Sequence, residues 1–292
     1  MIIIGENIHI ISKDVSTAVK ERNVKVIQDL AIAQTKAGAD YLDLNLGPAR
    51  KNPEETVEWL VTSVQAVSDL PLSIDTLNPI AMEAGLKASK KRPLLNSASG
   101  RTDSKEKTLP LAKKYNTDVV ISVLTDKGCP PDVETRTESI MDTVAYANEL
   151  GIPNEDIWVD PIILPVSADQ TQVTADLEFI KILGDILPGI KSTVGLSNVS
   201  NGTPEELRGI LNRTYLMMLK RNGLYSAIAD PLDKELMSLD KGKMPDIIDL
   251  IHKVMDEEHI NLSSLSQKQR DYVKTAQVLL GQTLYSHSWL ED

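Results

Sequence analysis

Acidic, amide and hydroxyl residues recur at the points where short apolar segments of this chain end. The side chains concerned are Glu6, Asp43, Asn45, Asp75, Asn96, Asp160, Ser197 and Asn198. A carboxylate accepts hydrogen bonds from two adjacent N–H groups, whereas a carboxamide both donates and accepts them. A flat heterocycle that alternates N–H donors with ring-nitrogen acceptors requires this mixture. These residue types therefore predict a site for a hydrogen-bonding ring of the pterin or purine kind.

The carboxylates alone would also allow a metal site, because oxygen ligands suit divalent cations. The aspartates that could gather at one place are Asp43, Asp75, Asp160 and Asp230. The carboxamides among them dilute the negative charge, so we expect no bound metal. No segment ends in a lysine for a Schiff base or in a histidine for general-base catalysis. Arginine is also absent from these ends, which disfavours a phosphate substrate.

Eight β-rich segments position these residues. They span residues 2–7, 41–46, 71–75, 93–97, 118–123, 156–160, 191–197 and 225–229. Between them, apolar residues recur at the three- and four-residue spacing of amphipathic helices. Asn52 and Asn78 are candidate N-caps, each followed by a proline that suits the first helical position. Strands that alternate with helices indicate a parallel sheet.

Eight such units between residues 2 and 229 predict an α/β fold of the (β/α)8 TIM-barrel type. The carboxyl ends of the strands form the mouth of such a barrel, which would bring the polar residues together. A doubly wound open sheet is the alternative. It would carry a glycine-rich phosphate loop after the first strand, and the sequence GENIHIISKD is not such a loop.

The chain after Asp230 shows only helical and loop signals. Residues at about 240–266 are predicted to form a helical insertion near the C-terminus, within or just before the closing helix. This segment is too short to bury a core of its own. We therefore expect residues 1–292 to form a single domain.

Composition excludes several classes of function. The net charge of -11 disfavours nucleic acid, which favours basic surfaces, and aromatic residues make up only 4% of the chain. No apolar run reaches the ~18 residues of a membrane span. The single cysteine, Cys129, rules out an intrachain disulfide. We expect a cytoplasmic protein whose partner is a small molecule or another protein, with no nucleic acid and no membrane.

Motifs at nearly every strand end carry a resemblance to a known family. They are GENIH, GADYLDLNLGP, SIDTLNPIAMEAGL, LLNSASG, VDPIILP, GLSNVSNG, LNRTYL and AIADP. Together they resemble the methyltetrahydrofolate:corrinoid/iron-sulfur protein methyltransferases, which are pterin-binding TIM-barrel enzymes. The resemblance runs from residue 2 to about 236 and resumes near residue 273. The segment around 240–266 is extra relative to this family and is a candidate contact for a different corrinoid partner.

The resemblance implies a methyltransferase that moves the N5-methyl group between methyltetrahydrofolate and the cobalt of a corrinoid protein. The pterin ring would lie in the barrel mouth, with its pyrimidine edge on Asp75, Asn96 and Asp160. Asn198 would lie near N5 and act catalytically by hydrogen bonding, with the proton coming from solvent. The corrinoid would be carried by a separate protein, and members of the family are usually homodimers.

Five further residues are assigned to the pterin site. They are Asp43, Asn45, Ser197, Glu6 and Arg208. Asp43 and Asn45 are equally compatible with internal hydrogen bonding beneath the substrate. Arg208 falls on a predicted helix, where a solvated or ion-paired role competes with folate binding.

Two other functions share the predicted fold or ligand. A dihydropteroate synthase would need a basic loop after the second strand and a Ser-Arg-Lys type end, whereas this chain has NLGPARKNP and ADPLD. A non-catalytic folate-binding subunit would need no more than the site itself. Uptake of methyltetrahydrofolate without methyl transfer would distinguish such a binder from an enzyme.

Overall fold

A computed structural model of the chain describes residues 1–49 and 52–291. The predicted barrel is confirmed: eight parallel strands lie in the order β7-β6-β5-β4-β3-β2-β1-β8. The strands are β1 (Ile2–His9), β2 (Tyr41–Gly47), β3 (Leu72–Thr76), β4 (Leu94–Ser99), β5 (Asp118–Ser122), β6 (Ile157–Asp160), β7 (Lys191–Ser192) and β8 (Ser226–Ala229). Arg50 and Lys51, in the predicted loop NLGPARKNP, lie outside the described residues.

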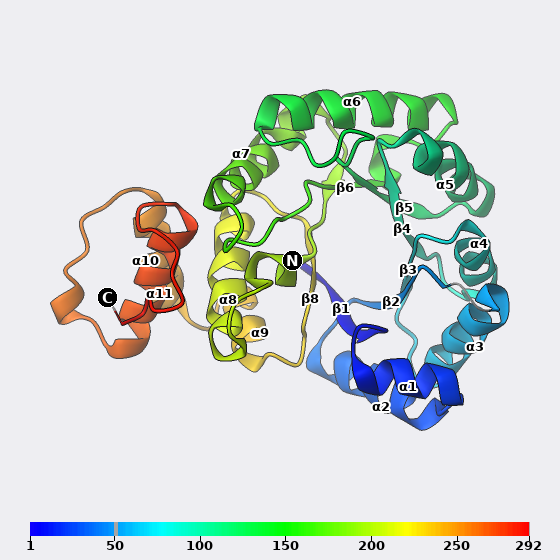
Figure 1. The fold of residues 1–292 in the computed structure, drawn as a ribbon, viewed down its shortest axis with the longest axis horizontal. Coiled ribbons are helices and arrows are strands. Elements are labelled where there is room, and N and C mark those ends of the chain that lie inside the picture. Colours follow the sequence, from blue (N-terminus) through cyan, green and yellow to red (C-terminus); the bar gives the residue numbers. More distant parts are fainter. Residues whose placement is uncertain (50–51, 292) are drawn as a thin grey trace.

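Helices surround the strands in a ring (Figure 1). They are α1 (Lys13–Glu21), α2 (Val24–Ala37), α3 (Pro53–Gln65), α4 (Pro79–Ala88), α5 (Thr102–Tyr115), α6 (Val133–Glu149), α7 (Gln170–Ile186), α8 (Glu205–Arg221) and α9 (Lys234–Asp240). Asn78 caps α4 as predicted, because its side chain accepts from Ile80 N at 2.9 Å. Asn52 precedes α3, but its side chain does not cap that helix.

The segment 191–197 is strand only at Lys191–Ser192, which is shorter than predicted. From Leu196 to Ser200 the chain forms a short 3-10 helix, η2. Asn and Ser side chains favour turns, and the end of the predicted strand lies in this turn instead. The barrel still closes, because Gly195 bridges Ile228 in parallel and Ile228 N donates to Val194 O at 2.8 Å.

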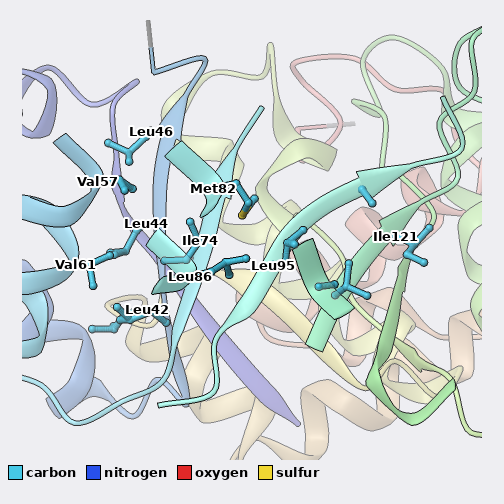
Figure 2. Close-up of a cluster of buried hydrophobic side chains, with 14 of the residues drawn as sticks. Leu42, Leu44, Leu46, Val57, Val61, Ile74, Met82, Leu86, Leu95 and Ile121 are labelled. Atoms are coloured by element: carbon cyan, nitrogen blue, oxygen red, sulfur yellow. The ribbon is translucent and has the colours of Figure 1, made fainter. Parts of the chain in front are cut away.

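The core lies between the strands and the surrounding helices. Figure 2 shows Leu42, Leu44 and Leu46 of β2 pointing toward Val57 and Val61 of α3. Side chains alternate along a strand, so the residues between these leucines face the barrel interior instead. The apolar residues of β2 thereby hold the strand against its helix, and Asp43 and Asn45 are directed into the barrel.

Two further helices, α10 (Pro245–Met255) and α11 (Gln267–Leu279), pack outside α8 (Figure 1). A 3-10 turn, η3 (Leu262–Ser264), lies between them, and another, η1 (Asn154–Asp156), precedes β6. Ile251 and Val273 share one apolar cluster with Leu216 of α8 and Ile3 of β1. This shared cluster supports a single domain for residues 1–292, which stays a prediction together with the insertion at 240–266. No helix within residues 1–49 and 52–291 has the length and apolarity to cross a membrane.

Candidate active site

A cavity of about 620 Å³ opens at the carboxyl ends of the strands. It is lined by all nine side chains that the sequence assigns to the site: Glu6, Asp43, Asn45, Asp75, Asn96, Asp160, Ser197, Asn198 and Arg208. Asn7, His9, Ile11 and Asp230 also line it. The structure therefore brings the predicted residues together, and the role of each stays a prediction.

Asn45 and Asp75 lie side by side because β2 and β3 pair with these residues in register. Asn45 Nδ2 donates to Asp75 Oδ2, and Asn45 Oδ1 accepts from Gly47 N at 3.1 Å. The second bond fixes which end of the carboxamide faces the carboxylate. Burial raises the pKa of Asp75 well above its usual range, and the negative charges of Asp43 and Asp160 raise it further.

Asp43 lies deeper in the barrel and is only 3% exposed. Its Oδ1 accepts hydrogen bonds from Ser73 Oγ at 2.5 Å and from Asn96 Nδ2 at 3.3 Å. Burial raises the pKa of Asp43 to about 6, and these two hydrogen bonds oppose the rise. Asp43 thus orients the carboxamide of Asn96. This is internal hydrogen bonding, one of the two roles that the sequence allows for Asp43.

Asp160 ends β6 and turns one oxygen toward the backbone. Its Oδ1 accepts from Ile162 N at 2.8 Å, whereas no described residue donates a hydrogen bond to Oδ2. Burial raises the pKa of Asp160 to about 6, while the Ile162 N–H and the Arg136 guanidinium lower it. The carboxyl group therefore keeps one oriented oxygen for a ligand in the cavity.

A buried ion pair lies behind Asp160. Arg136 of α6 and Asp176 of α7 are both 0% exposed, with 3.0 Å between Nη1 and Oδ1. Arg136 Nη2 also donates to Gln172 Oε1 at 2.8 Å. Sequence reasoning did not single out this pair, because charged residues on amphipathic helices usually face solvent. No sequence signal distinguishes these two from their exposed neighbours.

Glu6 of β1 lines the same cavity as Asn198 and is hydrogen-bonded to the residue that precedes it. Ser197 Oγ donates to Glu6 Oε2 at 3.1 Å. Burial raises the pKa of Glu6 to about 7; the Ser197 hydrogen bond opposes this, and the charges of Asp230 and Asp43 add to it. A carboxyl group with this pKa exchanges its proton readily near neutral pH.

Asn198 is held by the η2 turn. Its backbone N–H donates to Gly195 O at 3.2 Å, and its Oδ1 accepts from Asn201 Nδ2 at 3.3 Å. A Cβ atom on Gly195 would lie 3.0 Å from Asn198 Nδ2, so the carboxamide lies directly over this glycine. No described residue accepts from Nδ2, which leaves this donor for a ligand.

Arg208 lies in the first turns of α8 and ties that helix to η2. Its Nε donates to Ser200 Oγ at 3.1 Å, and Nη1 lies 3.5 Å from a carboxylate oxygen of Glu205. Arg208 lines the cavity and is also ion-paired with Glu205, and its contact with folate stays a prediction.

A second cavity of about 730 Å³ adjoins the first, between α8 and α9. The two cavities share Glu6, Ser197, Glu205, Arg208 and Asp230. Asp230 is held as an acceptor by Asn7 Nδ2 at 2.9 Å and by Leu232 N at 2.8 Å. Asn7 and Asp230 lie at the ends of predicted strands, but the sequence alone does not assign them to the site. Within residues 1–49 and 52–291, no group of three or more His, Cys, Asp or Glu side chains could hold a metal ion.

The fold and the site define a TIM-barrel protein whose mouth suits a hydrogen-bonding heterocycle. Residues 12–229 match the pterin binding enzyme family, and the chain belongs to that family. The chain is 31% identical over 239 residues to a methylcorrinoid:tetrahydrofolate methyltransferase of Eubacterium limosum, covering 81% of this chain and 88% of that protein. The resemblance to the corrinoid-linked methyltransferases is thereby confirmed, and the chain is a methyltransferase.

Two other kinds of protein are similar to this chain, one in sequence and one in fold. Methionine synthase of Mycobacterium leprae is 27% identical over 210 residues, which cover 68% of this chain and 17% of that protein. Dihydropteroate synthase of Yersinia pestis superposes with a TM-score of 0.60 at 18% identity, over 76% of this chain and 90% of that one. At this identity the structural likeness shows the fold alone.

Proposed function

We propose that this protein transfers a methyl group between N5 of tetrahydrofolate and the cobalt of a corrinoid carried on a separate protein. One observation carries the proposal: the carboxylates and carboxamides assigned to a pterin converge in a single cavity at the barrel mouth. The 31% identical relative is named for transfer from methylcorrinoid to tetrahydrofolate. We propose the same net direction here.

The pyrimidine edge of the pterin would bind to Asp75, Asn96 and Asp160. Each carboxylate accepts from adjacent N–H groups of the ring, and the carboxamide can complement both a donor and an acceptor. The fixed orientations of Asp75 and Asp160 support this assignment, because Asn45 and the Ile162 N–H each hold one oxygen. A preorganised set of partners reduces the ordering cost of binding.

Asn198 would contact the N5 region, where its Nδ2 is free to donate. Asn198 is exposed at the mouth, so the bound folate and corrinoid would have to exclude water from it. In a site dried in this way, a preorganised donor typically contributes about 3 kcal/mol to transition-state stabilisation. Its effect would fall on the transfer step, because charge at N5 changes only as the N5–methyl bond forms or breaks. The hydrogen bond that Asn198 Oδ1 accepts from Asn201, and the packing of Nδ2 over Gly195, support such a role.

The corrinoid partner would dock over the barrel mouth, because the cobalt must reach a methyl group held in the cavity. Three large apolar side chains around this mouth are well exposed: Ile11 by 86%, Leu77 by 82% and Ile80 by 54%. Ile11 lines the cavity itself, Leu77 directly follows β3, and Ile80 lies in the first turn of α4. We refer to these three residues as the apolar rim. We also propose that the protein is a homodimer, as the resemblance to the methyltransferase family implies.

A spectroscopic assay tests the transfer. Purified protein is mixed with methylcobalamin and tetrahydrofolate, or with Co(I) cobalamin and methyltetrahydrofolate, and the cobalt absorption is followed. We expect enzyme-dependent conversion that requires the folate, and Asp75→Asn should weaken folate binding, measured by calorimetry. A protein that binds methyltetrahydrofolate without any conversion would be a folate-binding subunit. Condensation of p-aminobenzoate with a pterin diphosphate would instead indicate a dihydropteroate synthase.

A further inference from the structure

Glu6 is an acidic residue of the site that lines both cavities. Its carboxyl group lies on the wall that the two cavities share. Ser197 Oγ binds it at 3.1 Å, and Ser197 immediately precedes Asn198, the residue proposed to contact N5. The Glu6 carboxyl group and the Asn198 carboxamide therefore belong to the same part of the cavity wall.

Three other carboxylates of the cavity already have proposed roles: Asp75 and Asp160 at the pyrimidine edge, and Asp43 beneath Asn96. Asp75 accepts from Asn45, and Asp160 accepts from Ile162 N. Asp230 already accepts from two N–H donors, Asn7 Nδ2 and Leu232 N. Burial lowers the pKa of His9, so its imidazole holds a proton less well than usual. Among the described residues, only the Ser197 hydroxyl donates a hydrogen bond to the Glu6 carboxyl group.

Methyl transfer at N5 requires a proton to move. A tertiary amine is a poor leaving group, so N5 must gain a proton as the methyl group departs. In the opposite direction, N5 carries one proton too many once it is methylated. A carboxamide hydrogen bond can stabilise this charge but cannot complete the proton transfer, because Asn198 is not a usable acid.

We propose that Glu6 is the general acid and base that exchanges this proton with N5. The inference rests on the proposed function and deepens it, because it assigns to one residue a proton that solvent would otherwise supply. The second cavity, which Glu6 also lines, gives its carboxyl group a path to water for the next turnover.

Atoms and electrons balance in both directions. Toward the folate, the N5 lone pair forms the N–C bond, and the cobalt keeps the electron pair of the broken Co–C bond as Co(I). The ionised Glu6 then takes the N5 proton. Toward the corrinoid, protonated Glu6 gives its proton to N5, the Co(I) electron pair forms the Co–C bond, and the N–C electron pair stays on N5.

The charged groups that face Glu6 match this role. Asp230 of β8 and Asp43 of β2 disfavour its ionised form, whereas Arg208 of α8 and the Ser197 hydroxyl favour it. Together with burial, the largest cause, they raise the pKa of Glu6 to about 7. General acids and bases work best when their pKa lies near the operating pH.

Single-turnover rates measured between about pH 5 and pH 9 in both directions test this assignment. In the wild type, transfer to Co(I) cobalamin should decline as the pH rises through about 7, and transfer to tetrahydrofolate should decline as it falls through the same value. Glu6→Gln should lower both rates by about 10²–10⁴-fold, the usual range for loss of a general acid or base. Equilibrium binding of methyltetrahydrofolate should stay within about threefold, since the lost interaction concerns the proton.

Two further variants keep the test decisive. Ser197→Ala removes a hydrogen bond that lowers the pKa of Glu6. The pH at which each rate declines should therefore be higher in this variant than in the wild type. Glu178→Gln alters an exposed carboxylate on α7 and should match the wild type throughout. If Glu6→Gln kept the wild-type rates and the wild-type pH dependence, the role of Glu6 would be overturned, whereas the proposed function would stand. Absence of transfer by the wild type, with folate bound, would overturn the proposed function and this inference together.

Discussion

Arg136 and Asp176 pair at 3.0 Å between α6 and α7, and neither side chain is exposed. The pair lies close enough to Asp160 for the Arg136 guanidinium to lower the pKa of that site residue. A buried charge that loses its partner is strongly destabilising, whereas exchange of both charges for apolar groups is often neutral. The relationship therefore links the stability of the barrel to the electrostatics of its mouth.

Arg136→Met should reduce the free energy of unfolding by about 3–5 kcal/mol, because it leaves the Asp176 carboxyl group buried and unpaired. Urea unfolding followed by circular dichroism measures the loss. The control is Lys25→Met, which removes an exposed pair with Asp29 and should cost no more than about 1 kcal/mol. Combining Arg136→Met with Asp176→Leu should recover part of the stability. A single variant as stable as the control would contradict the importance of the buried pair.

The stability of the unliganded protein should fall as the pH rises from about 5 to about 8. The pKa of Asp43 is raised from 3.8 to about 6 in the folded chain. Its proton therefore favours folding below pH 3.8, and this contribution is lost as the pH rises through about 6. The difference corresponds to about 3 kcal/mol for this group. The raised pKa values of Glu6 and Asp160 act in the same direction.

Asp43→Asn isolates the contribution of that residue. A carboxamide oxygen can still accept from Ser73 and Asn96, so both hydrogen bonds to Oδ1 are retained. The variant has no charge to desolvate, and its urea midpoint should depend less on pH than that of the wild type. An equal pH dependence in both proteins would show that Asp43 stays ionised throughout this range.

Gly195→Ala should slow methyl transfer with little effect on folate binding. The added Cβ would lie 3.0 Å from Asn198 Nδ2, so the carboxamide must shift by a few tenths of an ångström. Small displacements of a catalytic group cost rate rather than affinity, and we expect roughly a tenfold loss in single-turnover rate. Gly184→Ala serves as the matched control, because its Cβ meets no atom within 4 Å on α7. A Gly195→Ala rate equal to that of this control would count against a positioned Asn198.

The barrel and most of its mouth were predictable because two signals coincide. Leucines that alternate with Asp43 and Asn45 indicate both a strand and the face that it turns inward. The end of the seventh strand was less predictable, since the turn preference of Ser197 and Asn198 competes with an apolar run. Local propensities therefore brought the predicted residues to one cavity but misjudged the backbone that carries Ser197 and Asn198.

The electrostatics of the mouth could not be predicted from the sequence. Glu6 has a raised pKa because burial, Asp230 and Asp43 act on it together, and these residues are distant in the chain. The pairing of Arg136 with Asp176 likewise depends on how α6 packs against α7. Single residues with ordinary local sequence contexts acquire these properties only from the closed barrel.

The apolar rim makes a prediction about the partner that is separable from the chemistry. Leu77→Asp and Ile80→Asp place charges on side chains that are 82% and 54% exposed, so they should leave folding intact. Loss of apolar contact should raise the KM for the corrinoid protein by about tenfold for each residue, as for interface residues that contribute about 1.4 kcal/mol. The rate with free cobalamin should change far less, because a small corrinoid needs no protein interface. Met141→Asp, on the exposed side of α6, controls for added charge. Equal KM values for the rim variants and this control would move the docking surface elsewhere on the barrel.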